Sequence, residues 1–236
     1  MTDPTSETPP TLMMVSSMAT RRLLAELVEA FEATSTARVS VESIGGVDAA
    51  KRVRAGAAFD LVVLAADVID ALSNEGHIVA GSRVDIVTSA VAVAVPAGAG
   101  RPDLSSADGV RRAVIDAATI GYSTGPSGTY LANLFARWGI ADDVKKRVVV
   151  PPPGIPVGSL VARGEIALGF QQLSELMSLD GIDVVGLLPA EIQCLTTFSG
   201  GVAATSTQPE AARRVLAFMA GPEVAAIKRR NGMDPV

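Results

Sequence analysis

Short apolar runs alternate with segments of helical periodicity along most of the chain. Residues 12–15 form a continuous apolar run that predicts a buried strand, and apolar positions between 23 and 31 share one helical face. Further strands are predicted at 39–41 and 61–65, each followed by a helix. Strands that alternate with helices indicate crossover connections and a parallel sheet with helices on both faces. The pattern therefore predicts an α/β fold.

Two longer β-prone runs, at 86–95 and 195–205, enclose a second strand-helix alternation. We interpret them as strands that cross between two lobes and act as a hinge. Each lobe is then a mixed sheet flanked by helices, and a ligand is expected in the cleft between the lobes. The predicted organisation is a flexible tail at 1–11, a first lobe of 12–87 plus 200–236, and an inserted second lobe of 88–199.

Composition excludes several classes of function. Of the 236 residues, 48% are apolar and 19% are charged, which rules out global disorder. Aromatic residues are only 4% and the net charge is -5, so we expect no nucleic-acid binding. The apolar runs are far shorter than the ~18–20 residues of a membrane span, so no membrane insertion is expected. One cysteine, Cys194, and one histidine, His77, favour a protein without metal or cofactor.

The first ten residues are polar and proline-rich, without the basic start and apolar run of a secretory signal. As written, the sequence predicts a cytoplasmic protein. A protein whose export signal had been removed would look the same, and it would be periplasmic or extracellular. An ABC permease is an expected partner only in that exported case.

Three predicted strand-to-helix junctions carry small, hydroxylated or glycine residues. The first N–H groups of a helix lack partners and lie at the positive end of its dipole, which favours anions. Each junction alone also fits a plain helix cap or a tight turn. Together they predict a pocket in which neutral donors bind a small carboxylate or oxyanion. The candidate ligand-binding residues are Ser16, Ser17, Gly45, Gly46, Ser123, Ser127, Gly128 and Thr129.

Other polar residues are candidates at single positions. Gln171 and Gln172 follow a predicted strand, so either could reach the cleft. A reaction would need a group that takes and returns a proton, and Glu191 and Tyr122 are candidates for that catalytic role. Glu191 also fits a solvated turn. Arg83 fits a partner for either a ligand carboxylate or a neighbouring acid.

Seven segments, in order, resemble the molybdate-binding branch of the bacterial solute-binding proteins, which have the type II periplasmic-binding fold. In that branch serine hydroxyls and helix-start N–H groups hold the oxyanion. Ser17 matches the first of these serines, whereas Gly46 occupies the position of the second and Gln171 or Gln172 that of a tyrosine. The matching segments are MMVSSMATRRLLAEL, RVRAGAAFDLVVLAADVIDAL, SAVAVAVPAGAGRPDLSS, GTYLANLFARWGI, VARGEIALGFQQLSEL, LPAEIQCLTTFSGG and PEAARRVLAFMAGPEVAAIKRRNGM.

The QQLSEL and LPAEIQ pieces resemble a subgroup that includes aconitate isomerase, a cofactor-free enzyme acting on an unsaturated tricarboxylate. That resemblance implies an arginine in the crossover strand, where this sequence has Thr88, which we include among the ligand-binding candidates. Two hypotheses follow. The first is a two-lobe protein that captures a small anion. The alternative is a cofactor-independent isomerase that shifts a proton in an unsaturated or keto carboxylate.

Overall fold

The first lobe is built around strand β1 (Thr11–Ser17) in this computed structural model, which describes residues 11–152 and 154–236. Strand β1 pairs in parallel with β2 (Arg38–Ile44) and with β3 (Leu61–Ala65). Every residue of β3 is buried, as its continuous apolar run predicts. The predicted tail lies outside the described residues except for Thr11, which begins β1.

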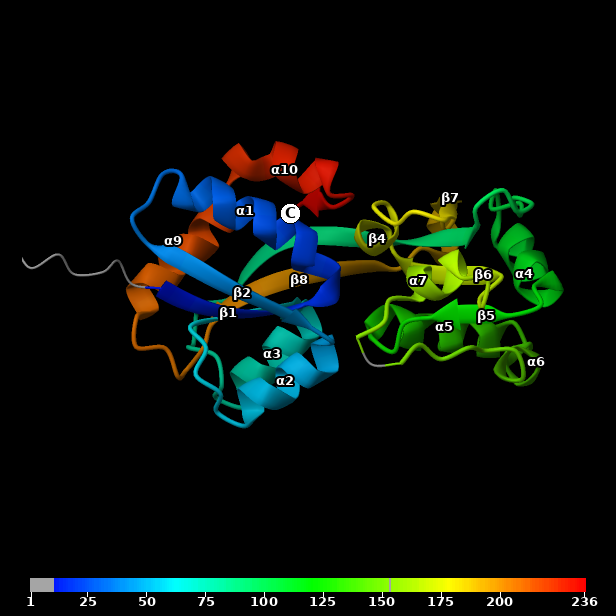
Figure 1. The fold of residues 1–236 in the computed structure, drawn as a ribbon. Helices are drawn as coiled ribbons and strands as arrows, with labels where there is room; N and C mark the ends of the chain where they lie inside the picture. The colour runs from blue at the N-terminus through cyan, green and yellow to red at the C-terminus, as the bar shows by residue number, and fades with distance from the viewer. Residues whose placement is uncertain (1–10, 153) are drawn as a thin grey trace, which may run out of the picture.

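Helices cover both faces of this part of the sheet (Figure 1). Side chains alternate between the faces, so Leu61 and Val63 belong to one apolar cluster and Val62 and Leu64 to the other. The first cluster lies under α1 and α9, and the second lies under α2 and α3. The bounds of the first-lobe helices are α1 Arg21–Glu32, α2 Gly46–Arg54, α3 Ala66–Asn74, α9 Pro209–Ala220 and α10 Ala225–Arg230, with short 3₁₀ turns η1 Met18–Thr20 and η3 Pro222–Val224.

Two long strands connect the lobes, β4 (Val84–Pro96) and β8 (Leu195–Val202) (Figure 1). Strand β4 pairs with β8 from Val84 to Ala90 and then with the strands of the second lobe from Val91 onward. The sheet order is β2-β1-β3-β8-β4-β6-β5. The two predicted crossover strands are therefore confirmed, although β8 ends at Val202 rather than continuing to 205. The predicted lobe boundaries, 87/88 and 199/200, fall inside these two strands and stay a prediction.

The second lobe has its own apolar core, centred on Phe135. The Phe135 ring lies 5.9 Å from Tyr122, 6.1 Å from Phe170 and 6.0 Å from Trp138, measured between ring centroids. This aromatic cluster fixes α5 against β5 and β6. The second-lobe elements are α4 Ala107–Asp116, β5 Ile120–Tyr122, α5 Pro126–Arg137, α6 Ala141–Lys145, α7 Val157–Ala162, β6 Leu168–Gln172, α8 Leu173–Leu176, β7 Ile182–Leu187 and η2 Ala190–Ile192. The chain ends with a short strand, β9 (Asp234–Pro235), which pairs with Val87 and Thr88 of β4.

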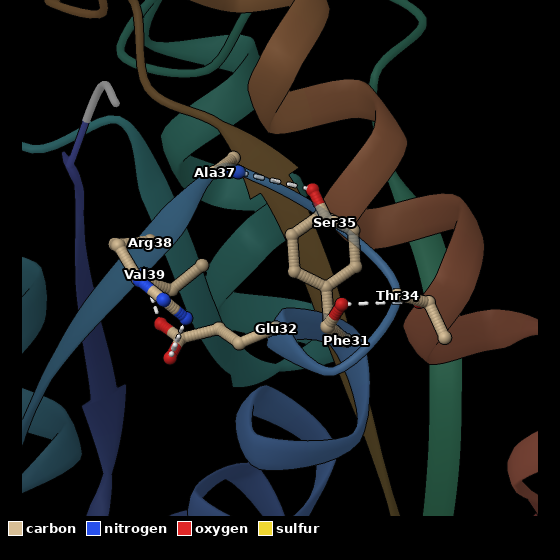
Figure 2. Close-up of polar contacts among 7 residues, drawn as sticks. All are labelled: Phe31, Glu32, Thr34, Ser35, Ala37, Arg38 and Val39. Atoms are coloured by element: carbon tan, nitrogen blue, oxygen red, sulfur yellow. Dashed lines mark hydrogen bonds and ion pairs between the residues drawn. The ribbon is translucent and has the colours of Figure 1, made fainter. Parts of the chain in front are cut away.

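The turn between α1 and β2 fixes where the edge strand begins (Figure 2). Val39 N donates a hydrogen bond of 2.8 Å to Glu32 Oε1, and Arg38 pairs with the other carboxylate oxygen at 3.1 Å. The Thr34 hydroxyl donates to the Phe31 carbonyl at the end of the helix. These contacts satisfy backbone groups that the helix end and the strand start leave free.

Within the described parts of the chain, no helix combines the length and the apolar character that a membrane span requires.

Candidate functional site

The carboxyl end of β1 presents two buried serines. Ser16 lies opposite Ser43 of β2 in the parallel register, and the two hydroxyl oxygens are 2.8 Å apart. Ser17 precedes η1 with an extended backbone, yet its side chain makes no capping hydrogen bond to the turn. Its hydroxyl oxygen lies 3.5 Å from that of Thr20, which donates to the Ser17 carbonyl at 3.1 Å. The Ser17 hydroxyl is therefore not used as a helix cap.

The start of α2 lies beside Ser17. Gly45 is the cap residue of α2 and Gly46 is its first residue, and neither glycine has a positive φ. A Cβ on Gly46 would meet only the Cβ of Ser17 within 4 Å, at an ordinary distance of 3.8 Å. Neither backbone conformation nor packing within the described chain therefore demands glycine at position 46.

The third junction, between β5 and α5, is held together by its own residues. The hydroxyl oxygens of Ser123 and Ser127 lie 3.1 Å apart, and Ser127 is buried. A Cβ on Gly128 would lie only 1.6 Å from the Ser123 carbonyl oxygen, so this turn requires glycine. Thr129 is exposed, and its hydroxyl donates to the Gly125 carbonyl at 3.4 Å. Packing alone thus explains the glycine at position 128, independently of any ligand.

Both candidate glutamines are buried and have protein partners. When the side-chain amide of Gln172 is oriented so that both its oxygen and its nitrogen have partners, the oxygen accepts from Thr196 Oγ1 and the nitrogen donates to Ser89 Oγ, each at 2.9 Å. Gln172 therefore ties β4 to β8. Gln171 accepts a hydrogen bond of 3.0 Å from the Gly158 N–H in the first turn of α7.

Sequence reasoning missed the other partner of Gln171, which is Glu175. Gln171 Nε2 donates to Glu175 Oε1 at 2.8 Å. Burial raises the pKa of the Glu175 carboxyl from 4.5 to about 7, and the hydrogen bond from Gln171 offsets only part of this effect. The four-residue spacing between Gln171 and Glu175 was the available signal, but it crosses from a strand into a helix, where no simple periodicity applies.

The short helix α8, which carries Glu175, contacts the first lobe. The Ser174 hydroxyl donates to the Ala19 carbonyl at 2.9 Å, only two residues after Ser17. A Cβ on Gly232 would lie 2.8 Å from Met177 Sδ and 3.1 Å from Leu173 Cγ, so these side chains pack on the segment after α10. The second lobe is therefore joined to the first lobe through the contact of α8 with the turn after β1 as well as through the crossover strands.

The two candidate catalytic residues lie elsewhere in the second lobe. Glu191 is exposed, and its carboxylate accepts a hydrogen bond of 2.5 Å from Ala107 N at the start of α4. Tyr122 packs against Phe135, and burial raises the pKa of its hydroxyl. The contacts described for both residues are structural ones, and their catalytic role stays a prediction.

Two further candidates lie in or near the crossover strand. Thr88 is half-buried in β4, between Thr197 of β8 and Asp234 of β9. Arg83 pairs with Asp70 at 3.0 Å and with Asp85 at 2.8 Å. Of the two predicted partners for Arg83, a ligand carboxylate or a neighbouring acid, the structure shows neighbouring acids.

A surface hollow of about 410 Å³ lies beside α4 in the second lobe. Its charged lining comes from Arg101, Asp103, Arg112 and Asp116, and none of the predicted site residues line it. The three junctions, by contrast, lie at the ends of β1, β2 and β5, where α/β proteins commonly bind ligands.

Comparison with known proteins places the chain in a family. The model of the bacterial extracellular solute-binding protein family matches residues 12–234. The chain belongs to this family. A curated relative named aconitate isomerase, from a Pseudomonas species, is 36% identical over 234 residues, which cover 96% of this chain and 88% of the relative.

Solved structures of other binding proteins share the fold. The periplasmic molybdate-binding protein of Azotobacter vinelandii is 21% identical with a TM-score of 0.78, covering 94% of this chain and 98% of that one. The substrate-binding domain of a putative molybdenum ABC transporter from Clostridium difficile is 19% identical with a TM-score of 0.72, covering 96% and 99%. The solute-binding protein described here has the same type II periplasmic-binding fold, which confirms the predicted fold class.

Proposed function

We propose that this solute-binding protein binds a small anion, a carboxylate or an oxyanion, with hydroxyl and main-chain N–H donors. The observation that carries the proposal is the pairing of Ser17 with Gly46. The Ser17 hydroxyl is not used to cap its turn, and Gly46 opens a helix beside it with no packing reason for lacking a side chain. A hydroxyl that does not cap its turn, next to a helix start, suits a negatively charged ligand.

A carboxylate is the favoured ligand class. The relative at 36% identity is named for aconitate, a tricarboxylate, whereas the molybdate-binding structure is only 21% identical. The same relative supports a second candidate function, which is isomerisation of an unsaturated carboxylate by a proton shift. Both candidates use one anion site, and they differ in whether the bound molecule reacts.

The two candidates imply different partners. A binding protein that serves transport delivers its ligand to an ABC permease outside the cytoplasm, whereas the isomerase candidate needs no protein partner. Fractionation of the native host, followed by detection of the protein, distinguishes an exported form from a cytoplasmic one.

Thermal unfolding with a panel of anions tests the binding proposal. The panel contains cis-aconitate, trans-aconitate, citrate, molybdate, tungstate and sulfate, with chloride as the reference. A ligand present at 100 times its Kd stabilises the folded state by about 2.7 kcal/mol, so a true ligand raises the Tm in a concentration-dependent way. If none of the anions at millimolar concentration raises the Tm above the chloride reference, the proposal is wrong.

A matched pair of variants then locates the site. Ser17→Ala removes one hydrogen bond to a charged ligand, worth about 1.5–3 kcal/mol, so we expect affinity to fall roughly 10-fold to 100-fold. Ser40→Ala makes the same chemical change at an exposed position of β2, and its affinity is expected to equal that of the parent. Equal affinities for both variants would remove Ser17 from the site.

A further inference from the structure

A carboxyl group without a cationic partner among the described residues, that of Glu175, lies on the short helix that touches the turn after Ser17. Glu175 Oε1 receives its hydrogen bond from a neutral amide, that of Gln171. The Gly158 N–H donates to the amide oxygen of Gln171, and this contact turns the NH₂ group of Gln171 toward Glu175. The chain from Gly158 through Gln171 to Glu175 therefore holds the carboxyl group in one orientation.

The position of Glu175 links it to the end of β1. Its neighbour Ser174 donates to the Ala19 carbonyl in the turn that follows Ser17. The helix α8 thus contacts the turn that follows Ser17, one of the two proposed anion donors. Glu175 as a whole residue is half-buried, and desolvation by burial acts strongly on its carboxyl group.

The elements around α8 carry few ionisable groups. The turn η1 and strand β6 have none, and α7 has none. Strand β4 carries Asp85, which is paired with Arg83. The segment that packs on α8 through Gly232 follows the last turn of α10, which carries the buried Lys228 and the exposed Arg229 and Arg230, and Arg230 pairs with Glu26. The exposed Asp234 follows this segment. Burial is the largest cause of the raised pKa of Glu175, about 7, which suits a group that exchanges protons near neutral pH.

We propose that Glu175 is the proton-transfer residue of this protein, acting on an unsaturated carboxylate held by the donors at Ser17 and Gly46. This inference rests on the isomerase candidate of the proposed function. It names a residue that neither the sequence analysis nor the comparisons assign.

The step balances without any co-reactant. The Glu175 carboxylate takes a proton from the CH₂ group that lies between a carboxylate and the carbon–carbon double bond of the substrate. The C–H electron pair spreads over the three carbons and the attached carboxylates, where neutral N–H donors stabilise the growing charge. Glu175 then returns the proton to the far carbon. The double bond moves by one position, and nothing is oxidised or reduced.

Proton exchange measured by NMR tests the assignment. The full chain is incubated in D₂O with cis-aconitate or trans-aconitate, and deuterium incorporation and isomer conversion are followed together. Glu175→Gln keeps the size of the side chain and an oxygen that can accept from Gln171. We expect exchange to fall at least about 100-fold, within the range of general acid–base catalysis. The affinity for aconitate, from the Tm series, is expected to stay within about threefold.

One control variant, one competing candidate and a pH series complete the test. Glu165→Gln, an exposed glutamate of the same lobe, is expected to exchange at the parental rate. Glu191→Gln tests the carboxylate that the sequence pointed to, and a loss of exchange in this variant would assign the proton transfer to Glu191 instead of Glu175. The parental kcat/KM should fall below pH 7 as Glu175 becomes protonated. The residual kcat/KM of Glu175→Gln should not show this fall.

Each failure has its own signature. If Glu175→Gln exchanges within tenfold of the parent, or if Glu191→Gln loses exchange instead, the assignment of Glu175 is wrong and the isomerase function stands. If the parent binds aconitate but exchanges nothing, the isomerase candidate and Glu175 fall together, while anion binding stands. If no anion binds at all, the proposed function fails as well.

Discussion

Glu175 makes a testable contribution to the pH dependence of stability, independent of any substrate. Its carboxyl group has a pKa of about 7 in the folded protein, against 4.5 for an ordinary glutamate. Between these pH values the folded state holds a proton that the unfolded chain releases. The stabilising effect of protonated Glu175 is therefore complete below about pH 4.5, and it is lost as the pH rises through about 7.

The size of the effect follows from the same two values. A difference between 4.5 and about 7 corresponds to about 3 kcal/mol of unfolding free energy. This is an upper bound, because Glu175 keeps some contact with solvent. Glu175→Gln has no proton to lose and preserves the acceptor for Gln171. We therefore expect the variant to match the parent near pH 4.5 and to exceed it by up to about 3 kcal/mol at pH 8.

Urea unfolding of both proteins at pH 5, 6, 7 and 8, without ligand, measures this difference. Subtracting the two curves removes every other titrating group that the proteins share. Glu165→Gln serves as the control, because it makes the same chemical change in an exposed ion pair with Arg163, which contributes at most about 1 kcal/mol. A difference between parent and Glu175→Gln that stays constant from pH 5 to 8 would refute the burial of this carboxyl group.

Two further substitutions test structural features of the two lobes. Gly128→Ala places a Cβ against the Ser123 carbonyl, so we expect a loss of more than about 2 kcal/mol of stability in thermal or urea unfolding. Gly125→Ala is the control, because its Cβ would lie 3.9 Å from Ser123 Oγ, and it should lose less than about 1 kcal/mol. Lys228→Met removes a buried ammonium group that has no hydrogen-bond partner among the described residues, so the variant should gain about 1–3 kcal/mol in urea unfolding at pH 7; a loss of stability would show that the ammonium group is compensated.

Much of the fold could be predicted because local patterns report burial directly. The run at 61–65 is apolar at every position, and β3 occupies the same residues and is buried throughout. The long β-prone run at 86–95 similarly predicted β4, which spans both lobes. The exact lobe boundaries were beyond such patterns, since β4 changes its pairing partners at Val91 without any change in its apolar character.

The candidate site could be predicted only in part. Ser17 and Gly46 belong to separate strand-to-helix junctions, and their juxtaposition follows from the parallel register of β1 and β2. The sequence does not distinguish Gly128, which packing requires, from Gly46, which packing leaves free. Glu175 was missed because its burial comes from tertiary contacts, such as those of Gln171 with α7, and no periodic pattern in the sequence around Glu175 reports them.

Within residues 11–152 and 154–236 Glu175 has no ion pair, and this links the anion site with its proposed chemistry. Burial raises the pKa of Glu175, and the hydrogen bond from the neutral amide of Gln171 lowers it by less. An arginine in contact with Glu175 would attract a carboxylate ligand more strongly, but it would also lower the pKa of the carboxyl group toward that of an ordinary glutamate or below it. Such a carboxylate would be a weak base at neutral pH. Neutral donors hold an anion less strongly, and they leave the neighbouring carboxyl group with a pKa at which it both accepts and returns a proton.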